Sequence, residues 1–94
     1  MNIDDILVQD SESKSTAING SVVVLSIAAG AYFRFNEIGS EIWTMFAKPQ
    51  RVGDVLASLS QAYDVELSVI SGDALPFLQN LVEQRLLRAA AGAG

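Results

Sequence analysis

The chain has 94 residues, half of them hydrophobic and 18% charged, which is typical of one folded domain rather than of a disordered segment. Its formal charge of -5 argues against a nucleic-acid surface, which needs clustered Lys and Arg side chains. Because it has no cysteine and no histidine, disulfides, zinc–thiolate sites and the commonest nucleophile–base pairs of enzymes are excluded.

The longest apolar run, residues 22–33, is interrupted by Ser26 and Gly30 and is shorter than the ~20 residues that span a bilayer. Asp4 and Asp5 stand where a secretory signal would carry basic residues. We therefore expect a cytoplasmic protein that has no membrane segment.

Residues 3–8 are apolar apart from two acids, and they fit either an additional edge strand or a loosely packed arm. After a polar loop, Asn19-Gly20 suits the positive φ values of a tight hairpin turn. This turn predicts strands at about residues 13–18 and 21–27. Ala28-Ala29-Gly30 predicts a second turn, followed by a third strand at residues 31–35.

The three strands are expected to form an antiparallel meander with the third strand at an edge. In the middle strand, the odd-numbered residues from Val23 to Ile27 are expected to face the core with Phe33 and Phe35. Tyr32 and Arg34 would then point to the opposite face.

At Asn36 the pattern changes from strand to helix, because large apolar side chains now recur at helical spacing. Asn36 suits the N-cap of a helix expected over residues 37–47, and Pro49 ends it. A second helix is expected over residues 52–63. Its apolar face holds Val52, Val55, Leu56, Leu59 and Tyr63.

The third helix is expected to have a wide apolar face. Pro76 would clash with the carbonyl four residues back in a helix interior, so we expect the regular helix to begin at Asp73 after a turn at residues 68–72. Residues 89–94 have nothing to pack against and should fray. The face comprises Ile70, Ala74, Phe77, Leu78, Leu81 and Val82, and is closed by Leu86 and Leu87.

This order of elements predicts an α+β, winged-helix-like domain in which a three-stranded antiparallel sheet precedes a three-helix bundle (βββααα). One domain is expected over residues 1–94, with an ordered core at about 13–88 and a flexible tail at 89–94.

The acidic residues fall in loops, caps and outer helix faces, and no glycine-rich phosphate loop is present. Glu37 and Glu41 are neighbours on a helix, but two carboxylates alone make a poor metal site. We therefore predict no catalytic residue, no metal site and no cofactor. Three helices with a wing would permit DNA binding, although the charge opposes it.

The third strand indicates peptide binding instead. An exposed strand edge can be covered by an extended segment of a partner, which adds to the sheet through backbone hydrogen bonds. Tyr32 and Arg34 are candidate contacts. Phe77, Leu81 and Val82 fit either the core or a groove beside the strand, and Trp43 fits a core anchor.

Several motifs resemble the PqqD-like peptide chaperones, also called RiPP recognition elements, which recognise leader peptides of ribosomally made, post-translationally modified peptides. The resemblance covers about residues 19–87, and its junction motif looks most like the stand-alone leader-binding protein of lasso-peptide biosynthesis. Phe35 stands where the family usually has leucine, and Pro76 is a further departure. The matching motifs are Gly30-x-Tyr32-Phe33-x-Phe35-Asn36-Glu37-Ile38-Gly39-x-x-Ile42-Trp43, Val52-x-x-Val55-x-x-x-Leu59, Tyr63-Asp64-Val65, Phe77-Leu78-x-x-Leu81 and Leu86-Leu87.

The resemblance implies that the leader adds as an antiparallel strand to the third strand, beside the third helix, on a protein that is not an enzyme. It also implies two partners besides the precursor leader: a transglutaminase-like cysteine protease that receives the bound leader, and an ATP-dependent cyclase. The peptide-binding residues it implies are Ala31, Tyr32, Phe33, Arg34, Leu78, Leu81, Val82 and Arg85. Two alternatives are a chaperone of quinone-cofactor biosynthesis with a radical SAM partner, and a small winged-helix DNA-binding regulator.

Overall fold

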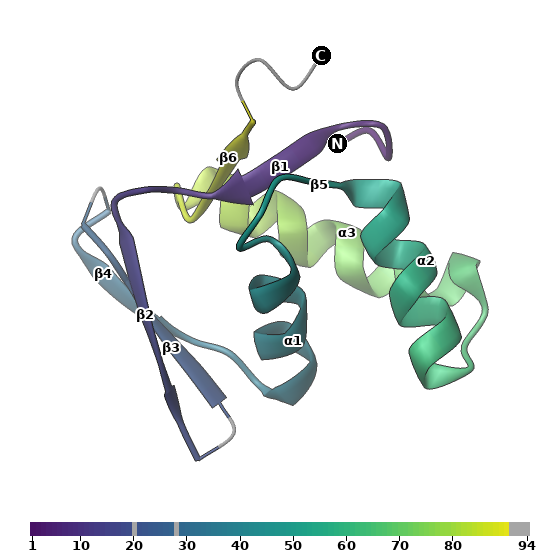
Figure 1. Cartoon of the computed structure of the whole chain (residues 1–94), viewed down its shortest axis with the longest axis horizontal. Helices are drawn as coiled ribbons and strands as arrows, with labels where there is room; N and C mark the ends of the chain where they lie inside the picture. Colours follow the sequence, from purple (N-terminus) through teal and green to yellow (C-terminus); the bar gives the residue numbers. More distant parts are fainter. Residues whose placement is uncertain (20, 28, 91–94) are drawn as a thin grey trace.

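A computed structural model describes residues 1–19, 21–27 and 29–90 (Figure 1). It confirms the α+β class, and the three predicted strands and three predicted helices occur in the predicted order. Additional short strands form a second sheet. The elements are β1 (Ile6–Gln9), β2 (Ser13–Ile18), β3 (Ser21–Ser26), β4 (Ala31–Arg34), α1 (Glu37–Met45), β5 (Gln50–Arg51), α2 (Val52–Tyr63), α3 (Leu67–Glu83) and β6 (Leu87–Ala89).

The first sheet is the antiparallel meander β2-β3-β4, with β3 in the middle. Phe33 is half-buried and Phe35 is buried, as predicted. The predicted core face of β3 was wrong, because Val24 and Ser26 are buried whereas Ile27 is 56% exposed. Val24 lies opposite Phe33, and the Ser26 hydroxyl accepts a hydrogen bond from the Ala29 N–H at 3.0 Å, so a polar residue is accommodated inside.

The second sheet has the order β5-β1-β6, and no pattern in the sequence predicted it. Residues 6–9 are its middle strand, so they are neither an edge strand nor a loose arm: Ile6 lies opposite Arg51, and Leu7 opposite Ala89. The Ala90 N–H also donates to the Ile6 carbonyl at 2.9 Å. The hydrogen-bonded structure thus extends beyond the predicted core at both ends, and residues 91–94 of the predicted tail lie outside the described residues.

The junction between strand and helix forms as predicted. The Asn36 side chain caps α1 by accepting the Gly39 N–H at 2.7 Å. Ser40, in the first turn, is buried between the two elements: its hydroxyl accepts the Val22 N–H at 2.8 Å and donates to the Phe35 carbonyl at 3.3 Å. These bonds fix α1 against β3 and against the residue that follows β4.

Helix α3 begins at Leu67, earlier than the predicted start at Asp73, and Pro76 lies inside it. Proline at this position cannot donate to the carbonyl of Gly72. Gly72 and Pro76 are both exposed, so water can hydrate that carbonyl, and the break costs less than it would in the core.

Helix α3 ends in a Schellman turn. The Leu86 N–H donates to the Leu81 carbonyl at 2.9 Å, and the Arg85 N–H to the Val82 carbonyl at 3.1 Å. Arg85 takes the left-handed conformation that this turn requires, with φ of 62°. Leu86 and Leu87 therefore lie beyond the helix face that they were predicted to close, and both are buried.

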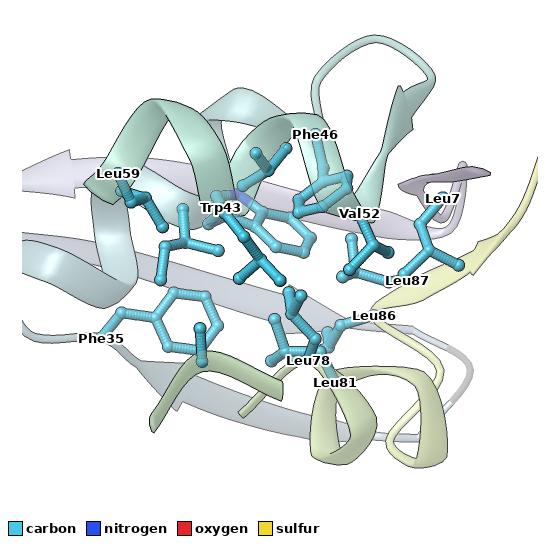
Figure 2. Close-up of a cluster of buried hydrophobic side chains, with 14 of the residues drawn as sticks. Leu7, Phe35, Trp43, Phe46, Val52, Leu59, Leu78, Leu81, Leu86 and Leu87 are labelled. Atoms are coloured by element: carbon cyan, nitrogen blue, oxygen red, sulfur yellow. The ribbon is translucent and has the colours of Figure 1, made fainter. Parts of the chain in front are cut away.

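The core lies where the three helices meet the two sheets (Figure 2). Helix α2 has the predicted bounds and buries four of its five predicted apolar residues, Tyr63 being the exposed one. Trp43 is 2% exposed and confirms the prediction of a core anchor. The largest fully buried side chains include Trp43, Phe46, Leu56, Leu78, Leu86 and Leu87.

Candidate functional site

Strand β4 is an edge strand, and among the described residues its strand partner is β3 alone. In an antiparallel strand, the N–H and C=O groups of successive residues point alternately to the two sides. The Phe35 N–H donates to the Val22 carbonyl at 2.9 Å, so the odd-numbered residues of this segment face β3. The N–H and C=O groups of Tyr32 and Arg34 consequently point away from the sheet.

A groove of about 690 Å³ opens at the C-terminal end of β4, between α1, α2 and α3. Most of its lining is apolar, and three large side chains at its surface remain considerably exposed: Ile38 at 48%, Tyr63 at 39% and Val69 at 52%. A cluster of exposed apolar side chains of this kind is typical of an interaction site. The groove is lined by Arg34, Phe35, Asn36, Ile38, Gly39, Ile42, Leu59, Tyr63, Val65, Val69, Ile70, Asp73, Ala74 and Phe77.

The groove carries few polar groups. Arg34 and Asp73 supply one charge of each sign. The Tyr63 hydroxyl donates to the Glu41 carboxylate and so joins α2 to α1, and this hydrogen bond raises the pKa of Tyr63 above its ordinary value. Within the described ranges, no three acidic side chains gather where they could hold a metal ion.

The four predicted contact residues on β4 fall into two pairs, which differ in the direction of their backbone groups. Arg34 lines the groove, and Tyr32 is 74% exposed. Ala31 and Phe33 are half-buried, and their backbone groups face β3. A segment added to this edge would therefore find its backbone partners at Tyr32 and Arg34, two of the four predicted residues.

The predicted contacts on α3 lie away from the groove. Leu78 and Leu81 are buried in the core (Figure 2), and Val82 borders a separate depression next to Leu7. Arg85 stands in the Schellman turn. The apolar face of α3 is wide because it meets several neighbours: Leu78 and Leu81 face the core, Val82 faces the depression next to Leu7, and none of the three lines the groove.

Phe77, which the sequence left open between core and groove, lines the groove together with Ile70, Asp73 and Ala74 of α3. The Phe77 ring meets Phe35 edge-on, with centroids 5.5 Å apart. Ile70, Ala74 and Phe77 share one helical face with Leu78 and Leu81, so the spacing alone could not separate the groove residues from the core residues. Ile38 belongs to the junction motif, but no pattern in the sequence marked it or Val69 as a groove residue.

Replacing Arg85 with glycine is expected to stabilise the protein by about 0.5–1 kcal/mol, because glycine adopts the left-handed conformation without a Cβ clash. The thermal midpoint should rise by roughly 2–8 °C. Arg88→Gly is the matched control: Arg88 is also exposed but lies in β6, where glycine weakens a strand. If both variants lowered the midpoint equally, this prediction would be wrong. The Arg85 side chain would then stabilise the protein by more than the strain of its left-handed conformation costs.

Comparisons with known proteins agree with this architecture. A solved structure of TbiB1 in complex with the TbiA(beta) leader peptide superposes with a TM-score of 0.80 at 26% identity, covering 89% of this chain and 98% of that one. The solution structure of the PqqD truncation of PqqCD from Methylobacterium extorquens, described as a stand-alone RiPP recognition element, gives a TM-score of 0.77 at 19% identity and covers 94% of each chain.

No curated protein sequence matches the chain significantly. A family model does match, over residues 21–87, which is well over half of the chain, and this range contains β3, β4 and all three helices. On that match the chain belongs to the family described as coenzyme PQQ synthesis protein D (PqqD).

Proposed function

We propose that this protein binds the leader segment of a ribosomally synthesised, post-translationally modified peptide precursor, in a lasso-peptide pathway, and that it is a recognition protein rather than an enzyme. The observation that carries the proposal is the outward-facing backbone of Tyr32 and Arg34 beside an apolar groove. The similarity to TbiB1, solved with a leader peptide, supports it.

The leader would add to β4 as an antiparallel strand. Each of Tyr32 and Arg34 offers one donor and one acceptor, and such backbone bonds give affinity without selecting a sequence. In an antiparallel pair, the N-terminal part of the leader lies at the Arg34 end of β4, which is the end where the groove opens. Leader residues that precede the paired segment would therefore enter the groove.

The groove would supply the specificity. Its lining is apolar, and burial of one large apolar side chain stabilises a complex by roughly 1.5–3 kcal/mol. Arg34 and Asp73 restrict the polar groups that can lie beside that side chain. We expect a leader with a large aliphatic or aromatic residue ahead of its paired segment.

The bound leader would then be presented to the enzymes that process the precursor. Because the leader is held along one edge, the remainder of the precursor extends away from the domain. In the lasso pathway these enzymes are a transglutaminase-like cysteine protease, which removes the leader, and an ATP-dependent cyclase.

A second candidate is the chaperone of quinone-cofactor biosynthesis, whose partner is a radical SAM enzyme. The description of the matching family favours it. The same edge and groove would serve, so the two functions differ in the peptide that binds and in the enzyme that acts on it.

The test is a titration of the purified protein into two fluorescently labelled synthetic peptides, a lasso-precursor leader and the quinone-cofactor precursor, followed by fluorescence anisotropy. We expect saturable binding of the lasso leader at low micromolar concentration or below, with much weaker binding of the other peptide. Preference for the quinone precursor would select the second candidate. If neither peptide saturated at tens of micromolar, both functions would be refuted.

A further inference from the structure

The β2-β3-β4 sheet has a second face, opposite the one that meets α1 (Figure 1). Residues directly opposite each other in an antiparallel sheet share a face, so the register defines it. Lys14, Leu25 and Tyr32 form one row across the three strands, and Thr16, Val23 and Arg34 form the next. We call the surface made by these two rows the outer face.

The outer face combines an apolar centre with positive ends. Val23 and Leu25 are only half-buried on the middle strand, and Tyr32 is exposed beside them. Lys14 on β2 and Arg34 on β4 stand at the two sides. The two rows hold no carboxylate in a protein with 11 acidic and 6 basic residues, and within the described ranges neither cation forms a salt bridge.

This charge pattern selects among possible occupants. A second copy of the chain would bring Lys14 and Arg34 against the same cations, and two molecules of net charge -5 repel each other. Nucleic acid needs more than two cations on one face. A protein surface with an apolar patch bordered by carboxylates is complementary to the outer face, because its apolar patch would cover Val23 and Leu25 and its carboxylates would pair with Lys14 and Arg34.

The outer face also adjoins the edge where the leader would add. A strand paired with β4 directs alternate side chains to the two faces, so half of its paired residues would lie on the outer face beside Tyr32 and Arg34. A protein docked there would touch the sheet and the bound peptide together.

We propose that the outer face is the docking surface for a maturation enzyme that acts on the bound peptide, and that this enzyme meets it with an apolar patch bordered by carboxylates. This inference rests on the proposed function. The enzyme binds the loaded protein more tightly than the empty one, and by thermodynamic linkage it tightens leader binding by the same factor. The docking site shares Arg34 with the groove, and its other residues lie on the outer face of the sheet.

The test uses the full chain, the labelled leader and the purified leader peptidase of the pathway. Lys14→Glu changes the outer face at an exposed residue, and Lys48→Glu makes the same charge change at an exposed residue outside the sheet. Peptidase association is measured by biolayer interferometry with and without leader, and leader affinity by anisotropy without peptidase. Leu25→Thr tests the apolar centre while retaining a good strand former.

We expect the wild-type protein to bind the peptidase at least about fivefold more tightly when loaded, and Lys14→Glu to weaken that association roughly tenfold. Leu25→Thr should also weaken it. Leader affinity should stay within about twofold for Lys14→Glu, and Lys48→Glu should match the wild type in both measurements.

Equal effects of Lys14→Glu and Lys48→Glu on the peptidase, with leader binding intact, would overturn the docking surface and leave the proposed function standing. A dimer that forms with rising concentration in analytical ultracentrifugation, and that Lys14→Glu weakens, would also overturn the docking surface. The outer face would then be occupied by a second copy of the chain. If the wild-type protein failed to bind any leader, both proposals would fall.

Discussion

Tyr32→Pro is expected to weaken leader binding at least about tenfold while leaving the sheet folded, because proline removes one outward-facing N–H and places its ring where the leader backbone would pair. Proline is tolerated at an edge strand when the lost N–H faces solvent, as that of Tyr32 does. Anisotropy with the labelled leader measures the binding, and circular dichroism verifies the fold.

Two controls separate the backbone from the side chain and from the general effect of proline. Tyr32→Ala removes the ring but keeps the N–H, so it should retain most of the affinity. Ser15→Pro makes the same backbone change on β2, the opposite edge: the Ile27 N–H donates to the Glu12 carbonyl, so the even-numbered residues of that segment face β3 and Ser15 faces outward. Leader binding that survived Tyr32→Pro, or failed equally in Ser15→Pro, would refute strand addition at β4.

Leu78→Ala is expected to lower the free energy of unfolding by about 2–5 kcal/mol, because it leaves a cavity in the core. Domains of this size have roughly 5–15 kcal/mol in total, so the thermal midpoint should fall by roughly 10 °C or more. Chemical denaturation followed by fluorescence of Trp43, the one tryptophan and a buried residue, provides the measurement.

Val69→Ala is the counterpart on the same helix. Val69 is exposed at the groove, so its truncation should change stability by less than about 1 kcal/mol yet weaken leader binding. The reverse result, with Leu78→Ala stable but unable to bind, would show that the α3 contacts lie where the resemblance placed them and not in the groove.

Local signals in the sequence were enough to predict the strands and helices on which the candidate site lies. Asn19 has the positive φ, 51°, that the predicted hairpin turn needs, whereas Gly20 lies outside the described residues. This signal and the cap at Asn36 act within a few residues, and the β2-β3-β4 meander and the start of α1 agree with them. The apolar periodicity of α2 likewise gave the bounds Val52–Tyr63. The edge position of β4 followed from strand order alone.

What escaped prediction depends on distant contacts. Strands β1, β5 and β6 are two to four residues long, and β1 meets β6 across almost the whole chain, with Leu7 opposite Ala89. Segments this short have no pattern of their own. Arg34 and Phe77 were named from the sequence as candidates, whereas Ile70, Asp73 and Ala74 were not assigned to a groove. The apolar face of α3 divides between core and groove according to how its neighbours pack, and the sequence does not show that packing.

Pro76 has a mechanical consequence for the α3 wall of the groove. The C-terminal half of α3 is anchored by Leu78, Leu81 and the connection into β6, whereas Val69, Ile70 and Asp73 precede the proline. Helices bend most readily at a proline, where a rung of the hydrogen-bond ladder is missing. The missing hydrogen bond to the Gly72 carbonyl therefore weakens the backbone link between the core-packed end of α3 and the residues before Pro76 that line the groove.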